Sequence, residues 1–253
     1  ELLFGRTHTG YAGGPGQRAF LPVGGDVGRE AVPPGHGGFF GLASVHSTMD
    51  SHEDGPISLP EPSVDDLPSV GTVVAARRSR RSFTAEALSL DDLATLCWAV
   101  QGVTDPENGF RAAPSAGATY PLSVAVIVGE GGVEGLEAGI YRYRQAAHAL
   151  EHRESGDVRD QLRDACLDQA WVGAAPVSLV LLADPTPTAA QYGDRGRERY
   201  VPMEVGHAGQ NLYLVAEALD LGTVAVGAFD DRAVGAVVGA GERASPMAVY
   251  PVG

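Results

Sequence analysis

The amino-acid sequence predicts an α+β fold with one globular domain over residues 69–253. Two observations lead to this class. Helical patterns and short β-branched runs follow one another in this region, neither strictly alternating nor segregated, which favours one mixed domain. No internal repeat is present. Residues 1–68 are rich in Gly and Pro and then acidic, with no sustained apolar period, so we expect them to be disordered or extended. The chain starts with Glu1, and the interpretation that residues 1–48 are not native stays open.

The clearest helix signals surround Ser89 and Gly102. Ser89 is a good N-cap, and Asp91 and Asp92 follow in the first turn, where the helix dipole favours carboxylates. Apolar residues then recur on one face until Gly102 ends the helix. The longest apolar period covers 201–221, and Gly222 ends it. Further helices are predicted over 69–79, 157–169 and 233–239.

Short runs of β-branched and apolar residues predict the strands of a sheet. The segments GIYRYR and ALEHR flank a short turn, which is typical of a hairpin. The run that follows Gly222, TVAVGAF, is expected to be a strand that passes close to a ligand because it contains glycine. The predicted strands are 123–130, 139–144, 149–153, 177–184, 223–229 and 247–253.

Charge and composition exclude several classes of function. The formal net charge is −14, so the surface repels nucleic acid and anionic lipid, and we expect neither as a partner. No apolar run is long enough to span a membrane, and the N-terminus lacks the order of a signal peptide. Cys97 and Cys166 are the only cysteines and lie far apart in sequence, which fits a reducing compartment. The chain is therefore expected to be soluble and cytoplasmic.

The segment RRSRRSF, residues 77–83, places four arginines within five residues of an acidic protein. Adjacent like charges repel, and no acidic cluster lies nearby in the sequence. A bound phosphate would offset this charge, since guanidinium groups suit phosphate oxygens. The alternative is a solvated basic helix end, which the helix dipole also favours.

Two glycine-containing segments are suited to a flat ligand. The segment APSAGATYPL, residues 113–122, forms a loop before a buried strand, where small residues let backbone N–H groups approach a ligand. The segment LGTVAVGAF, residues 221–229, has glycines with the same effect. For the loop, an ordinary tight connection is the alternative.

No motif indicates a metal site. Glu204, His207 and Asn211 form a polar stripe on the longest predicted helix, and a Glu-x-x-His pair binds metal in bundles that supply a second copy. That copy is absent from the sequence, so the stripe is interpreted as a hydrogen-bond network or a subunit contact. His148, Glu151 and His152 spell a zinc-protease pattern, but they fall in the predicted hairpin and not on a helix.

Taken together, these motifs resemble the nitroreductase family and, within it, the SagB-type dehydrogenase branch. The resemblance runs from about residue 77 to 253. It includes RRSRRSF, WAVQG, PSAGATYP, GIYRYR, DQAWVGAAP, QYGDRGRERY, GHAGQNLYLVAEALDLGTVAVGAFDD and the terminal YPVG.

This resemblance implies a nitroreductase-like FMN-binding fold, with a central, mostly antiparallel sheet surrounded by helices. It also implies an intertwined homodimer with FMN at the subunit interface, which the longest helix largely forms. One group of residues is expected to hold the FMN phosphate and the polar edge of the ring: Arg77, Arg78, Ser79 and Arg81. A second group is expected to approach FMN from the other subunit: Pro114, Ser115, Ala116 and Gly117. A third offers backbone groups near the ring: Ala225, Val226 and Gly227. The positive charge of Arg81 is expected to stabilise reduced flavin.

The resemblance also implies a catalytic residue and one departure. Azoline-oxidising members of the SagB-type branch have a Lys-Tyr pair before a G-x-R-G segment, and the corresponding residues here are Gln191 and Tyr192. Tyr192 is the candidate catalytic residue, whereas glutamine has no titratable proton and is no general base.

Three hypotheses about function stay open. The leading one is an FMN-dependent oxidoreductase that transfers electrons from NADH or NADPH to a small acceptor, of nitroaromatic or quinone type. The second is a dehydrogenase that oxidises azoline rings in a modified peptide. The third is a non-catalytic scaffold with a flavin-binding fold, since fold alone does not fix function.

Overall fold

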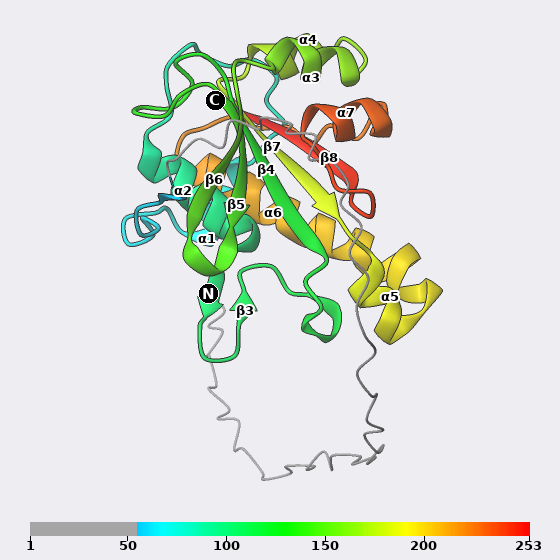
Figure 1. Cartoon of the computed structure of the whole chain (residues 1–253). Helices are drawn as coiled ribbons and strands as arrows, with labels where there is room; N and C mark the ends of the chain where they lie inside the picture. Colours follow the sequence, from blue (N-terminus) through cyan, green and yellow to red (C-terminus); the bar gives the residue numbers. More distant parts are fainter. Residues whose placement is uncertain (1–54) are drawn as a thin grey trace, which may run out of the picture. The chain divides into compact units, whose positions relative to one another are not determined.

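The computed structural model describes residues 55–253 (Figure 1). The prediction for residues 1–48 lies outside the described residues. Within the described part, the folded chain begins earlier than the predicted boundary at residue 69. The short strand β1 (Ile57–Ser58) pairs with β6, and Leu59 is buried. The sequence prediction included these residues in the extended N-terminal segment, because an acidic, proline-containing stretch gives no signal for so short a strand.

A six-stranded sheet forms the centre of the fold, in the order β1-β6-β5-β4-β7-β8. Every neighbouring pair in it is antiparallel, which agrees with the mostly antiparallel sheet that the family resemblance implied. Its main strands are β4 (Leu122–Val128), β5 (Gly139–Arg144), β6 (Ala149–Ser155), β7 (Val177–Ala183) and β8 (Ser245–Val252). The strands β2 (Val103–Asp105) and β3 (Phe110–Arg111) form a separate small sheet.

Helices cover both faces of the sheet (Figure 1). On one face lie α2 (Leu90–Gln101) and α6 (Val201–Ala218), with α1 (Val70–Ala76) against α6. On the other face lie α3 (Arg159–Ala165), α4 (Ala170–Ala174) and α7 (Asp231–Val237).

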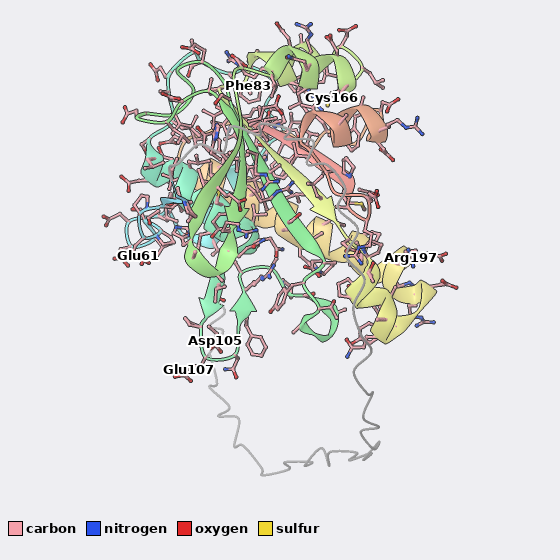
Figure 2. The ribbon with its side chains drawn as sticks, in the orientation of Figure 1. Glu61, Phe83, Asp105, Glu107, Cys166 and Arg197 are labelled. Atoms are coloured by element: carbon pink, nitrogen blue, oxygen red, sulfur yellow. The ribbon has the colours of Figure 1, made fainter. Side chains whose placement is uncertain are left out.

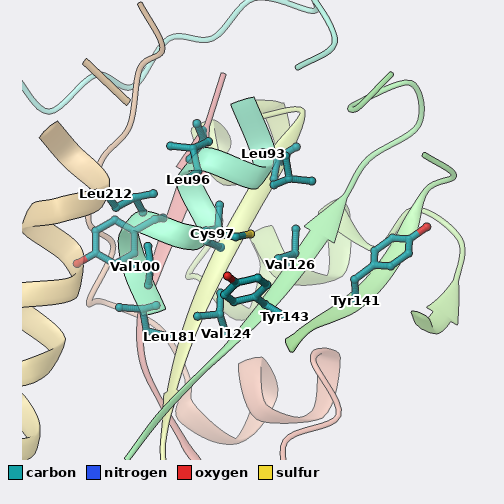
Figure 3. Close-up of a cluster of buried hydrophobic side chains, with 14 of the residues drawn as sticks. Leu93, Leu96, Cys97, Val100, Val124, Val126, Tyr141, Tyr143, Leu181 and Leu212 are labelled. Atoms are coloured by element: carbon teal, nitrogen blue, oxygen red, sulfur yellow. The ribbon is translucent and has the colours of Figure 1, made fainter. Parts of the chain in front are cut away.

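The alternation of strand residues produces two apolar layers. Val124 and Val126 of β4 face α2 and α6, whereas Ala125 and Ile127 belong to the layer under α3 and α7. Figure 3 shows the first layer, where leucines of α2 and Leu212 of α6 pack towards the sheet. Both faces of the central strands are buried, which explains their continuous apolar runs.

Several predicted helices and strands are confirmed. The Ser89 hydroxyl accepts a hydrogen bond from the backbone N–H of Asp92 at 3.0 Å, and α2 ends before Gly102. The hairpin predicted for 139–153 is formed by β5 and β6. Among the described residues, no helix combines the length and the apolar character needed to cross a membrane.

Two predicted elements were wrong in part. The predicted helix 157–169 ends at Ala165, because Leu167 and Asp168 adopt left-handed backbone angles, with φ of 59° and 58°. The predicted strand 223–229 is absent, since the segment pairs with the sheet only through isolated bridges of Thr223 with Val252 and of Val226 with Val249, although Val224 and Val226 pack in its core. The sequence also gave no sign of α5 (Thr186–Tyr192) or of the π-helical turn Gly196–Tyr200.

Candidate functional site

The arginine cluster follows α1 directly, with Arg77 at the C-terminal cap of the helix. Arg80 forms an ion pair with Glu217 of α6, at 2.8 and 3.0 Å to its two carboxylate oxygens. No acidic cluster lies near the arginines in the sequence, but the fold supplies a carboxylate to Arg80 from a residue 137 positions away. Arg78 donates to the last carbonyls of α1, including that of Ala75 at 3.0 Å.

The other two arginines lie over aromatic rings. The guanidinium of Arg77 is 5.0 Å from the ring centre of Tyr213, and that of Arg81 is 5.5 Å from the ring of Trp171. Within residues 55–253, Arg77, Arg78 and Arg81 have no carboxylate partner. Three positive charges thus stay unbalanced, which fits an anionic ligand such as a phosphate.

The Tyr213 hydroxyl joins two of the predicted segments. It lies 3.0 Å from the hydroxyl oxygen of Ser79 and accepts a hydrogen bond of 2.7 Å from the backbone N–H of Ala225. A backbone hydrogen bond from Arg80 to the carbonyl of Thr223, at 2.9 Å, joins the same segments. The structure therefore brings the arginine cluster and residues 223–227 together.

Within the segment 225–227, only two of the three predicted residues are accessible. Ala225 and Gly227 are exposed, whereas Val226 is 3% exposed and belongs to the core. The Val226 N–H and C=O both pair with Val249, at 2.8 and 3.0 Å. The backbone of Val226 is therefore not free to contact a flavin, contrary to the expectation.

The loop that carries Pro114 to Gly117 contains a short 3-10 turn at Ala116–Ala118. The Ser115 hydroxyl accepts a hydrogen bond from Tyr120 N at 2.9 Å, and Gly117 has a φ of 60°, which favours glycine. A methyl group at Gly117 would overlap the side-chain oxygens of Gln191 and Tyr192. The candidate catalytic residue Tyr192 thus lies against this loop, and its ring also contacts Tyr200, with 5.1 Å between centroids.

A cavity of about 290 Å³ lies between this loop and the N-terminal half of α6. Glu204 is 2% exposed, and its Oε1 atom has no hydrogen-bond partner of good geometry among the described residues. Burial raises the pKa of Glu204, while Ser115, Arg111 and Gln101 act in the opposite direction. The cavity is lined by Pro114, Ser115, Ala116, Tyr200, Met203, Glu204 and His207.

Behind the cavity, polar side chains form the network that the sequence predicted for the stripe on this helix. Asn211 donates to the carbonyls of Ala99 and Ala112, at 3.0 and 3.3 Å. His207 donates to the carbonyl of Pro114 at 3.4 Å. Through these bonds, α6 fixes both α2 and the loop.

Arg111 extends the network towards Glu204. It donates to the side-chain oxygen of Gln101 at 2.8 Å, and its guanidinium lies 4.5 Å from the ring centre of Tyr120. Its backbone N–H donates to the Tyr120 hydroxyl at 3.1 Å. Sequence reasoning missed Arg111, Tyr120 and Gln101, because no short motif contains them.

The two halves of the candidate site lie apart along α6. His207 contacts the loop and Tyr213 contacts the arginine cluster, and the two residues are six positions apart on the helix, about 9 Å along its axis. Within the described part of the chain, no hydrogen bond or ring contact joins residues 77–81 to residues 114–117.

The zinc-protease-like pattern lies in the hairpin, as predicted. The two ring nitrogens of His148 are 2.8 Å from the Tyr143 hydroxyl and from the Pro60 carbonyl. Over residues 55–253, no group of three or more His, Cys, Asp and Glu side chains is placed to hold a metal ion. Figure 2 shows the side chains of the described residues on the ribbon.

Comparison with known proteins agrees with this geometry. The sequence model of the nitroreductase family matches residues 74–253. A Methanocaldococcus jannaschii protein named for the nitroreductases is 42% identical over 181 residues, 72% of this chain and 88% of its own length.

Solved structures agree as well. A crystal structure from Ralstonia eutropha, also named for the nitroreductases, is 28% identical, with a TM-score of 0.68 over 78% of this chain and 88% of its own. A chain of the Escherichia coli microcin synthetase McbBCD complex with truncated pro-MccB17 bound is 23% identical, with a TM-score of 0.61 over 85% of this chain and 84% of its own. At that identity, the likeness concerns the fold alone.

Proposed function

Because the chain belongs to the nitroreductase family and is an FMN-dependent oxidoreductase, we propose that it passes electrons from NADH or NADPH to a small acceptor. The acceptor is of nitroaromatic or quinone type. Bound FMN would supply the hydride chemistry, while the protein binds, orients and tunes the flavin. The observation that carries this proposal is the unbalanced arginine cluster joined through Tyr213 to the exposed backbone of Ala225.

The residues around Tyr213 fit FMN in charge and in shape. Arg77, Arg78 and Ser79 would bind the phosphate, since they are partly or fully exposed and have no carboxylate partner. Arg81 would face the polar edge of the ring. The exposed backbone of Ala225 and Gly227 would line the ring, without a contribution from Val226.

We further propose that the active form is a homodimer in which α6 forms much of the interface. In this assembly, residues 114–117 of one subunit would contact the flavin held by the arginine cluster of the other. Pro202, Gly206 and Gln210 of α6 are exposed at four-residue intervals. Such an exposed helix face is suited to pairing with a second copy.

The test is a visible absorption spectrum of the purified full-length chain, followed by rapid-mixing reduction with NADH and with NADPH. We expect about one FMN per chain, as the residues above form one site per chain. We also expect bleaching by a nicotinamide and reoxidation by menadione or a nitroaromatic. An FMN-loaded protein that neither nicotinamide reduces would overturn the proposal.

Oxidation of azoline rings in a peptide is the second candidate function. Its support is the position of Gln191 and Tyr192 against Gly117, in the loop that is proposed to contact the flavin. Glutamine provides no base, and Gln191→Lys is therefore expected to increase thiazole formation on a known thiazoline peptide. No increase in an FMN-loaded variant would remove this candidate.

A further inference from the structure

The cavity beside Glu204 has one polar end and an otherwise apolar wall. Pro114, Ala116, Met203 and Tyr200 supply the apolar part, and Ser115 and Glu204 lie at the polar end. Its volume of about 290 Å³ equals about ten water molecules at roughly 30 Å³ each, which suits a molecule of one or two aromatic rings. Met203 and His207 are exposed, so the cavity opens to solvent beside them.

The carboxyl of Glu204 indicates a ligand, because the fold leaves one of its oxygen atoms without a hydrogen bond. Buried polar atoms are nearly always hydrogen-bonded, and an orphan buried carboxyl oxygen costs about 1 to 3 kcal/mol. Glu204 is 98% buried, since its exposed fraction is 2%, yet its Oε1 has no partner of good geometry in the described part of the chain. A ligand in the cavity would supply the missing partner.

We propose that this cavity binds the aromatic acceptor with a quinone or nitro oxygen against the Glu204 carboxyl, which gives that oxygen a proton as the acceptor is reduced. This inference rests on the proposed function, in which Pro114 to Gly117 contact the flavin. Three residues of that loop line the cavity, so an acceptor bound there would lie beside the flavin.

Reduction of a quinone to a quinol requires a proton donor in addition to the hydride. Converting one quinone to a quinol consumes a hydride, which carries two electrons and one proton, and one further proton. The proposed function supplies the hydride, and the O–H bond of Glu204 breaks as the new O–H bond of the quinol forms. The carboxylate then accepts a hydrogen bond from the quinol and is reprotonated from solvent after product release.

Burial of Glu204 favours its acid form, whereas its polar and charged neighbours act in the opposite direction. Burial raises its pKa, so its proton is retained to higher pH than in an exposed glutamate. The charged and titratable groups that act on it are Arg111 from β3 and His207 from its own helix, with the polar Ser115 and Gln101 beside them. These four favour the ionised form, so the carboxyl can release the proton as well as hold it.

The experiment compares Glu204→Gln with Glu198→Gln in the FMN-loaded full chain. Both variants lose one negative charge by the same substitution, but Glu198 is exposed on the turn that precedes α6. Two quantities are measured in each: the Kd of menadione for the oxidised protein without nicotinamide, and the rate at which menadione reoxidises the reduced protein, as a function of pH.

In the parent protein, the reoxidation rate is expected to fall as pH rises through the raised pKa of Glu204. Glu204→Gln is expected to lower this rate about 100-fold on the low-pH side of the profile, where Glu204 of the parent is protonated, and to abolish the pH dependence, as for loss of a general acid. Its Kd for menadione should change much less, because the amide still donates a hydrogen bond. Glu198→Gln should match the parent in the Kd for menadione and in the reoxidation rate at every pH.

Several results would overturn the inference. Equal rates and pH profiles in the two variants would exclude a role for Glu204, and loss of the pH dependence in His207→Gln alone would assign it to the imidazole. No binding of menadione to the oxidised protein would exclude the cavity as its site. If Glu204→Gln does not fold, Met203→Trp tests the cavity instead, because a larger exposed side chain at the mouth should weaken menadione binding without releasing FMN. Glu204 takes no part in the reduction of the flavin by the nicotinamide. Failure of that reduction would therefore reject the proposed function and not the role of Glu204.

Discussion

Tyr213 is the residue whose hydroxyl connects the arginine cluster to the segment that would line the flavin. The substitution Tyr213→Phe removes this hydroxyl and keeps the ring on which Arg77 lies. Ser79 and Ala225 would each lose one hydrogen bond, of 3.0 and 2.7 Å. Because the proposed site includes both residues, the substitution should weaken FMN binding more than it weakens the fold.

The magnitude follows from the two bonds. The net contribution of one hydrogen bond to stability is about 0.5 to 1.5 kcal/mol, so two bonds contribute about 1 to 3 kcal/mol. If this energy holds the site in its binding geometry, the Kd for FMN should rise by a factor of about 5 to 150. The loss in unfolding free energy should stay within the same 1 to 3 kcal/mol, so the variant should still fold.

The assay is titration of the apoprotein with FMN, followed by quenching of flavin fluorescence. Tyr250→Phe is the matched control, because its ring contacts that of Tyr213 edge-on at 6.1 Å and it loses the same hydroxyl from a buried position. We expect the control to bind FMN with a Kd within about twofold of the parent. Tighter binding in Tyr213→Phe would refute the reasoning, since it would mean that the Ala225 N–H serves the flavin and that Tyr213 competes for it.

Three further outcomes are expected from the structure. Arg77→Gln should weaken FMN binding about tenfold or more, whereas Arg80→Gln, whose guanidinium is already paired with a carboxylate, should change the Kd by less than about threefold in the same titration. Gly117→Ala should reduce FMN binding and activity more than Gly131→Ala, because both have positive φ (60° and 62°) but only a methyl group at 117 meets other side chains. Burial would raise the pKa of Asp157, but hydrogen bonds from Arg159 and from backbone N–H groups outweigh it and lower this pKa to about 2. Asp157→Asn should therefore lower unfolding free energy by about 1 kcal/mol at pH 7, and the difference should shrink below about pH 4 and vanish near pH 2 in thermal unfolding.

The elements that the sequence predicted best are those whose local signals agree with their packing. In α2, the Ser89 cap, the two aspartates and the apolar face all indicate the same boundaries. The segment 223–229 shows the opposite case. Its β-branched residues suggest a strand, and it lies at the outer edge of β8, the last strand of the sheet order, but its backbone pairs there only through isolated bridges at Thr223 and Val226. The periodicity of a segment does not show whether its backbone forms a continuous hydrogen-bond ladder with a strand of the sheet.

The candidate site was predictable only where it follows a motif. RRSRRSF and PSAG marked two of its parts, since clustered charge and small residues are visible in one dimension. Tyr213 gave no such signal, because it lies beside the apolar face of α6 and its partners are 12 and 134 residues away. The pairing of Arg80 with Glu217 was missed for the same reason, with 137 residues between them.

The buried polar atoms that lack a partner indicate where the fold is incomplete. In residues 55–253 they belong to Gln101, Trp171, Ser178 and Glu204. Gln101 and Glu204 lie behind the loop of residues 114–117, and the ring of Trp171 lies under Arg81. A fold selected for stability alone would satisfy these atoms, because each costs about 1 to 3 kcal/mol. Gln101 and Glu204 lie beside each other, so their atoms mark one place, and Trp171 marks a second; both places border the segments that would hold flavin and acceptor.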